Sequence, residues 1–177
     1  MIINGMYYIK GIKDIIQLVG GEFNDVKERP VVALMQSYEN PKIFWAIPVG
    51  NYNHRREEKI KRIESFMNCP QDDIRSCYYH IGKTNIKSIF FISDVFPVSQ
   101  NYILREYLSY HSKHHVLKNP NLISALNEKL NRILAFEKSK LNKDGRFYFR
   151  QNIWGIYDRL DSESKSKSFV ADLDGKI

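Results

Sequence analysis

Two short stretches of this 177-residue chain carry side chains that could act on a phosphodiester. Lys27 and Arg29 precede the first of two apolar runs, and Asn51, Tyr52, Asn53 and His54 follow the second. Cutting RNA through its own 2'-hydroxyl requires a group to take that proton, a group to protonate the leaving 5' oxygen, and cations to stabilise the phosphorane charge. Histidine, lysine and arginine can fill these roles without a metal. The alternative is a set of solvated strand-end charges and a surface histidine, which composition alone favours.

The two apolar runs predict the strands that would bring these stretches together. Residues 31–35 and 42–49 are short, rich in β-branched and aromatic residues, and bounded by Asn, Pro and Gly, which favours strands over helices. The turn sequence at 38–41 between them predicts an antiparallel hairpin. Because a hairpin brings its open ends together, we expect Lys27 and Arg29 to lie near residues 51–54.

A second polar loop joins two further strand candidates, residues 75–81 and 86–92. Within it, Lys83, Thr84 and Asn85 offer an amino group, a hydroxyl and an amide close to His80. The loop could contact a phosphate or a base, and it could equally be a polar hairpin turn. Its Gly-Lys-Thr sequence is not a nucleotide-binding loop, because the upstream glycine and the following helix are missing.

Two basic segments are candidate RNA contacts. The helix predicted over 53–65 carries Arg55, Arg56, Lys59 and Arg62 around its apolar stripe, and such a face either lies along phosphates or is simply solvated. The segment 138–150 interleaves three aromatic residues at 147–149 with the cations Lys143, Arg146 and Arg150. Aromatics beside cations suit stacking on unpaired bases. Packing beneath the preceding helix is the interpretation that we favour for them.

Composition limits the class of protein. The formal net charge of +7 and the sequence pI of about 9.3 favour a polyanionic partner, although a merely soluble protein can also carry this charge. A hydrophobic content of 43% excludes general disorder, and the length fits one domain, 1–161, with a polar tail, 162–177, that we expect to be flexible. Neither a secretory signal nor an apolar run of roughly 20 residues is present, so we expect a cytoplasmic protein that does not contact membranes.

The cysteines and histidines do not predict a metal site. Cys69 and Cys77 lack the number and spacing of a zinc site or a disulfide framework, and we expect both to be reduced. His111, His114 and His115 lack an acidic residue or cysteine at ligand spacing, so a basic loop is favoured over metal binding. We therefore expect neither a metal nor another cofactor.

The order of the predicted elements indicates an α+β fold. A strand at 6–9 is expected first, followed by an amphipathic helix at 12–19. Pro97 indicates that the segment 94–98 lies at a sheet edge. Helices are expected at about 102–110, 119–138 and 153–160, so strands come first and the C-terminal half is mainly helical. Short antiparallel strands around a turn-rich basic centre favour a small bent sheet or a partly open barrel.

Several stretches, taken in order, resemble the ToxN/AbiQ family of endoribonuclease toxins from type III toxin–antitoxin systems, and are most like its CptN branch. They are RPVVAL, IFWAIPVGNYNHR, RSCYYHIGKTNIKSIFFISDVFPV and NPNLISALNEKLNRILAF. The resemblance as a whole covers roughly residues 5–160. The first strand with its Arg-Pro also resembles the wider MazF/PemK-like toxins. The resemblance implies an SH3-like, MazF-type barrel with added helices that cuts RNA to a 2',3'-cyclic phosphate. It also implies inhibition by a small, pseudoknot-type repeat RNA that the toxin processes, within a closed protein–RNA complex.

The resemblance also implies roles for particular residues. The family places a basic residue at the start of the first barrel strand, here Arg29, and hydroxyl and basic residues after the proline of the next strand. That second position reads Gly50 to Arg55 here, with Gly-Asn where relatives have Thr-Ser. His54 then becomes the proton-transfer group, Arg29 and Lys83 stabilise charge, and Asn51 and Asn53 position the phosphate. Ser76 and His80 are reserve candidates.

Two other classes of function stay open. A non-catalytic RNA-binding module on the same fold would present the same basic groove, because small bent sheets commonly bind nucleic acid. A structural phage or host-interaction protein would not retain RNA on purification, and the positive net charge of the chain disfavours this class. Only the enzyme predicts that His54→Ala or Arg29→Ala abolishes cleavage of cellular or phage RNA while the RNA still binds.

Overall fold

The computed structural model describes residues 2–21 and 31–174, with side chains described through residue 166. Lys27 and Arg29 lie outside the described residues. The strands are β1 (Met6–Ile9), β2 (Val31–Gln36), β3 (Ile43–Asn51), β4 (Tyr79–Lys83), β5 (Lys87–Phe91), β6 (Phe96–Ser99) and β7 (Ile103–Glu106). The helices are α1 (Ile12–Gln17), α2 (Glu57–Met67), α3 (Pro120–Asp144) and α4 (Ile153–Asp174), with short 3-10 turns η1 (Tyr52–His54), η2 (Ile74–Cys77), η3 (Ile92–Asp94) and η4 (Gln100–Tyr102). The predicted α+β class with a helical C-terminal part is confirmed.

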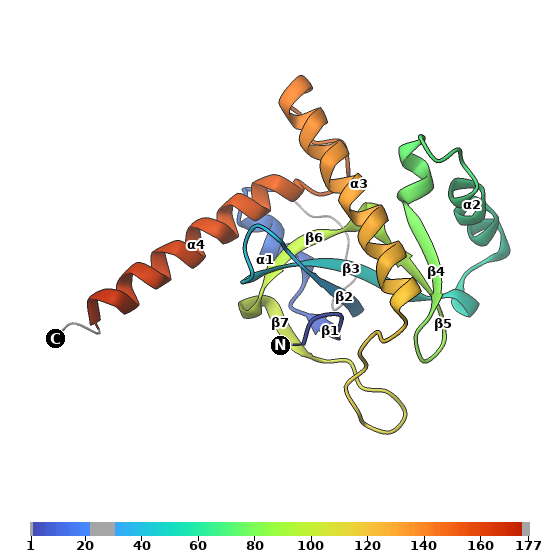
Figure 1. The fold of residues 1–177 in the computed structure, drawn as a ribbon, viewed down its shortest axis with the longest axis horizontal. Helices are drawn as coiled ribbons and strands as arrows, with labels where there is room; N and C mark the ends of the chain where they lie inside the picture. Colours follow the sequence, from blue (N-terminus) through green and yellow to red (C-terminus); the bar gives the residue numbers. More distant parts are fainter. Residues whose placement is uncertain (1, 22–30, 175–177) are drawn as a thin grey trace.

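One antiparallel sheet organises the described residues, in the order β4-β5-β3-β2-β1-β7, with β6 also paired to β3. The predicted hairpin is confirmed, because β2 and β3 pair antiparallel from Gln36 opposite Phe44 to Val32 opposite Pro48. On the side of β3 opposite β2, residues 49–51 pair with β5. The earlier half of β3 pairs with β6 on that same side, so β5 and β6 lie end to end along β3 (Figure 1). The placement of Pro97 in an edge strand is confirmed.

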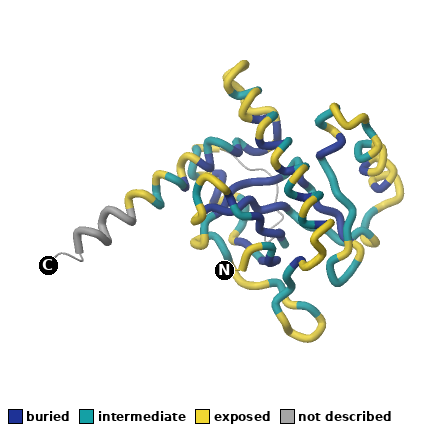
Figure 2. The backbone as a smooth tube through the Cα atoms, in the orientation of Figure 1, coloured by how far each residue is buried: buried dark blue, intermediate teal, exposed yellow. Residues whose placement is uncertain are grey.

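The main core lies between the sheet and the two long helices. Figure 2 shows the central strands as the buried interior, with α3 crossing one side of the molecule. The helix α3 begins as predicted, since the Asn119 side chain accepts hydrogen bonds from the amides of Asn121 and Leu122. It ends at Gly145, whose φ of 63° is the left-handed conformation that favours glycine at a helix end. The helix α4 packs on β6 and β3 through the stacked rings of Trp45 and Tyr157, whose centroids lie 5.2 Å apart.

A smaller apolar cluster fixes α2 to the other face of β5. Ile60 and Ile63 of α2 are buried against Ile89, which has no exposed surface. The remaining residues of α2 are largely exposed, in keeping with the basic helix predicted over this part of the chain. The α2 cluster and the main core therefore cover opposite faces of the β4–β5 hairpin.

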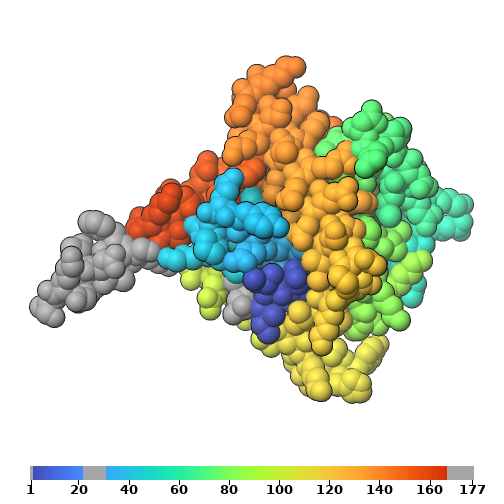
Figure 3. All heavy atoms as spheres, in the orientation of Figure 1, coloured from blue at the N-terminus to red at the C-terminus, as the bar shows by residue number. Residues whose placement is uncertain are grey.

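The prediction of a helix at 102–110 was wrong. Residues Ile103–Glu106 form β7, which pairs with the open side of β1 through Tyr7 opposite Glu106 and Tyr8 opposite Arg105. Only a few apolar residues defined the expected helix, and backbone pairing with β1 outweighs so short a pattern. The chain then forms a loop up to Asn119, which projects from the body at the bottom of Figure 3.

Several element boundaries also differ from the prediction: α2 covers Glu57–Met67 where 53–65 was expected, and α3 continues to Asp144 where about 138 was expected. The strand expected from residue 75 begins only at Tyr79, because Ile74–Cys77 form the turn η2. The Asp73 carboxylate starts that turn by accepting a hydrogen bond from the Arg75 amide at 2.9 Å. The last helix, expected to end near residue 160, continues to Asp174 and extends away from the body in Figure 1. Flexibility of the tail 162–177 stays a prediction.

Candidate functional site

Three strands bring the two predicted polar stretches to one end of the sheet. Ser88 in β5 lies opposite Asn51 in β3 on one side and opposite Gly82 in β4 on the other. Lys83 lies opposite Lys87 at the same end. The turn η1, with Asn53 and His54, and the loop with Thr84 and Asn85 are therefore neighbours across the start of β5. We call this region the strand end.

Hydrogen bonds inside the strand end hold its loops in place. The Thr84 hydroxyl lies 2.9 Å from the hydroxyl of Ser88, which is buried, and donates to the Asn85 side-chain oxygen at 3.1 Å. The Asn51 side-chain oxygen accepts a hydrogen bond from the Asn53 amide at 2.9 Å and so caps η1. The Asn51 side chain thus fixes the turn that carries Asn53 and His54, and the Thr84 hydroxyl fixes the loop between β4 and β5.

Aromatic rings bind the basic residues of this region. Lys87 Nζ lies 3.6 Å from the centroid of the Tyr52 ring, and the Arg55 guanidinium carbon lies 5.2 Å from the Phe91 centroid. Both distances lie within the range of a cation–π interaction. A side chain at Gly50 would collide with Arg55, since a Cβ built there lies 2.6 Å from Arg55 Nη2. Glycine at this position therefore lets the guanidinium lie close to the sheet.

A basic hollow opens beside η1, at the start of α2. Its volume is about 520 Å³, and its lining consists of His54, Arg55, Arg56, Glu58, Lys59 and Arg62. The hollow thus combines the predicted proton-transfer histidine with the predicted cations of the basic helix. His54 is exposed there, so its imidazole is accessible to a ligand. A concave site rich in arginine and lysine suits a phosphate-bearing ligand.

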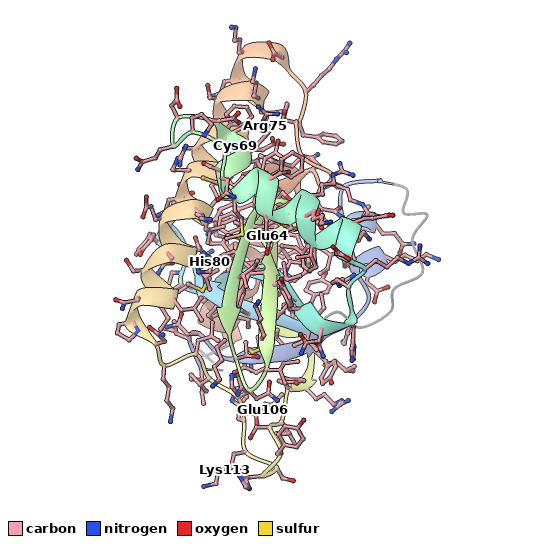
Figure 4. All side chains as sticks on the ribbon, turned by 90° about the vertical axis from the view of Figure 1, so that its right-hand side faces the viewer. Glu64, Cys69, Arg75, His80, Glu106 and Lys113 are labelled. Carbon is pink, nitrogen blue, oxygen red and sulfur yellow. The ribbon has the colours of Figure 1, made fainter. Side chains whose placement is uncertain are left out.

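His80 lies on the opposite face of the β4–β5 hairpin, toward α3. Its Nδ1 atom is buried and has no hydrogen-bond partner in the part of the chain that the structure describes. Lys129 of α3 is the nearby cation, and its Nζ donates to the Tyr79 carbonyl at 2.8 Å. Burial, together with the positive charge of Lys129, lowers the pKa of His80. Figure 4 shows His80 between α3 and the β4–β5 hairpin.

The remaining predicted contacts lie elsewhere. Ser76 precedes β4, at the end remote from Lys83; it is buried, and its hydroxyl donates to the Asp73 carbonyl at 2.7 Å. Lys143 is in the last turn of α3, and Arg146 and Arg150 follow that helix. Of these four residues, Ser76 therefore lies in η2, and Lys143, Arg146 and Arg150 lie at or beyond the end of α3 (Figure 1).

Sequence reasoning missed three residues of this region: Lys87, Ser88 and Lys129. Lys87 and Ser88 lay inside a predicted strand, where the alternation of side chains could have placed them on opposite faces. Lys129 lay within the predicted long helix, and only the packing of α3 on β4 brings it to His80. The sequence contained a signal for the first two residues and none for the third.

The described residues contain no cluster of three or more histidine, cysteine, aspartate or glutamate side chains that could hold a metal ion. Cys69 and Cys77 are both free thiols. In the loop after β7, His114 Nε2 lies 3.0 Å from the Met6 carbonyl and donates to it, which fixes that ring against β1. Within the described part of the chain, no helix has the length and apolar character needed to cross a bilayer.

Comparison of the chain with known protein families and with curated proteins finds no match.

Proposed function

We propose that this protein is a sequence-specific, metal-independent endoribonuclease toxin of a type III toxin–antitoxin system. One observation carries the proposal: an exposed histidine and four cationic side chains surround a hollow of about 520 Å³ beside the strand end. The strongly bent sheet is proposed to be a MazF-type, SH3-like barrel with added helices. The proposed location is the cytoplasm, and the proposed inhibitor is a small repeat RNA that the toxin processes and binds in a closed complex.

The chemistry follows from the side chains at the hollow. His54 transfers a proton during attack of the 2'-hydroxyl on phosphorus, and the 5' oxygen leaves with a proton to give a 2',3'-cyclic phosphate. Charge on the phosphorane is stabilised by cations nearby, for which Arg55, Lys83 and Lys87 are the candidates among the described residues. Asn51 and Asn53 fix the turn that carries His54, because the Asn51 side chain caps η1.

The test is cleavage of a mixed RNA pool by the purified protein in EDTA, with analysis of the product ends. Wild type is expected to leave 2',3'-cyclic phosphates, and His54→Ala is expected to reduce the rate by about 100-fold or more, as for loss of a general acid or base. His111→Ala is the matched control, since His111 is exposed in the loop after β7. Equal activity in His54→Ala and His111→Ala would reject the assigned role of His54.

A non-catalytic RNA-binding module is the second candidate. It is favoured by the internal hydrogen bonds of Thr84, Asn85 and Asn51, which give these polar side chains a structural role. The module predicts tight RNA binding without cleavage by wild-type protein. The enzyme predicts that His54→Ala still binds RNA that it no longer cuts.

A further inference from the structure

A continuous line of aromatic rings connects the basic hollow with the far end of α3. Neighbouring ring centroids in this line lie between 5.2 and 6.0 Å apart. We call it the aromatic track, and it consists of Phe91, Tyr79, Phe66, Tyr78, Phe149 and Tyr148 in that order. The elements β5, β4 and α2, which carry Phe91, Tyr79 and Phe66, lie on the side of the molecule that faces the viewer in Figure 4.

Arginines of the hollow cover the first part of the track. The guanidinium carbon of Arg55 lies 5.2 Å from the Phe91 centroid, and that of Arg62 lies 5.6 Å from the Phe66 centroid. Both arginines also line the hollow. A polyanion bound in the hollow therefore lies directly beside the first rings of the track.

The other end of the track is exposed. The Tyr148 side chain has 53% of its surface exposed, and the neighbouring Phe147 has 50%. Large rings with this exposure next to each other are unusual for a surface that contacts only water. Phe136 packs edge-on beneath Tyr148 with centroids 5.0 Å apart, so one face of the Tyr148 ring is supported by the protein.

A buried carboxylate fixes the backbone at this exposed end. Glu137 is only 1% exposed, and its two oxygens accept hydrogen bonds from the amides of Tyr148 and Phe149 at 2.9 to 3.2 Å. Burial raises the pKa of this carboxyl, against the opposing effect of the two backbone hydrogen bonds. These hydrogen bonds to Glu137 hold the backbone at Tyr148, so the position of its ring is fixed before a ligand binds.

The charge around the exposed rings matches an RNA strand. The segment 138–150 contains five lysine and arginine residues and one acidic residue, Asp144. Lys140 Nζ lies 5.5 Å from the centroid of Phe136, beneath Tyr148. Proteins bind unpaired nucleic-acid bases with exposed aromatic rings, on which the bases stack, and with nearby cations, which bind the phosphates.

We propose that the exposed end of the aromatic track, Tyr148 with the neighbouring Phe147, is a binding surface for a single-stranded RNA segment that leaves the hollow, with unpaired bases stacking on these two rings. The proposal rests on the proposed function only in taking the hollow as an RNA site. Recognition comes from the π-face of the bases and from the phosphates, so the surface accepts different base sequences. A duplex, whose bases are stacked on one another, binds this surface less well.

The test compares a 12-nucleotide oligouridylate with an abasic oligonucleotide of the same length and charge, both bound to the His54→Ala protein. Tyr148→Ala is expected to weaken oligouridylate binding roughly tenfold, since each base–aromatic stack contributes about that factor. Binding of the abasic strand is expected to change less than twofold. Tyr148→Phe retains the ring and should bind as the parent does, which also controls for folding. Tyr110→Ala removes an 86% exposed tyrosine in the loop after β7 and should have no effect.

Each other outcome has a defined meaning. Equal weakening of both oligonucleotides, or no weakening, overturns the stacking surface while leaving cleavage by wild-type protein as a separate question. Loss of self-association in Tyr148→Ala without RNA would assign the patch to a protein contact and overturn the proposal. Base-dependent binding at Tyr148 in a protein that never cuts RNA would retain the track and reject the nuclease.

Discussion

Lys87 Nζ lies 3.6 Å from the centroid of the Tyr52 ring, and this contact joins the start of β5 to η1. Tyr52 is the first residue of η1, which also contains Asn53 and His54. The Tyr52 hydroxyl donates to Glu64 of α2 at 3.3 Å, so the ring is held from both sides. The position of His54 therefore depends on a contact between β5 and η1 as well as on the end of β3.

Replacing Lys87 by Gln should lower the rate of RNA cleavage about tenfold while changing the free energy of unfolding by no more than about 1 kcal/mol. The stability effect is small because cation–π contacts at exposed sites contribute about that amount. The rate effect is larger because the substitution removes a cation at the strand end and loosens η1. Cleavage kinetics and urea denaturation of the same preparations measure the two effects.

Lys113→Gln is the matched control for Lys87→Gln, since it removes an exposed lysine of the loop after β7 with the same change in net charge. Similar rate losses in the two variants would mean that net charge alone matters. Lys87→Arg should retain most of the activity, because arginine keeps both the charge and the contact with the ring.

Gly82→Ala should destabilise the protein by about 1–3 kcal/mol, as expected for an added methyl group in a packed core. A Cβ at this position would lie 2.7 Å from Leu122 Cδ1 and 3.2 Å from Phe90 Cε2, and both side chains are buried. Thermal denaturation should show a lower melting temperature. Gly11→Ala, where a Cβ would meet no atom within 4 Å, should change stability by about 0.5 kcal/mol or less.

Local sequence patterns predicted the hairpins, the capped start of α3 and the α+β class. They could not show that β5 follows β6 along one side of β3 after Pro48, because that depends on strands far apart in the chain. The pairing of β3 with β5 places Asn51 beside Ser88. The prediction at 102–110 failed for a related reason, since β7 exists through its pairing with β1.

The aromatic segment at 147–149 shows a different limit of sequence reasoning. Packing was the favoured interpretation, and Phe149 is indeed buried, with 7% of its surface exposed. Phe147 and Tyr148 are about half exposed. Composition cannot separate the three residues, because the buried Glu137 carboxylate determines how the backbone turns at Tyr148 and Phe149.

Glu137→Leu should destabilise the protein by about 2 kcal/mol and weaken the Tyr148-dependent binding of oligouridylate. The substitution leaves the amides of Tyr148 and Phe149 without their acceptor, and an unsatisfied buried donor costs about 1–3 kcal/mol. Urea denaturation and fluorescence anisotropy measure the two effects. Glu128→Leu, at an exposed position of the same helix, should leave both quantities nearly unchanged. Unaltered oligouridylate binding by a destabilised Glu137→Leu protein would show that the ring needs no such support.

The half-buried imidazole of His80 should make the protein less stable as the pH falls through about 6.5, the ordinary pKa of histidine. Burial and Lys129 lower the pKa of His80 in the folded protein, so the unfolded chain binds more protons below that pH. The contribution of His80 to the free energy of unfolding should therefore decrease from pH 7.5 to pH 5.5. His115, whose pKa is lowered by burial and by His114, contributes with the same sign.

His80→Gln should reduce this pH dependence without removing it, because His115 still titrates. Lys129→Gln should reduce the His80 contribution in part, since it removes the nearby cation and leaves the burial of the ring. Urea denaturation at three pH values measures the slope for each variant. An unchanged slope in His80→Gln would mean that His80 is as well solvated in the folded chain as in the unfolded one, and the unpartnered Nδ1 would then be in contact with water.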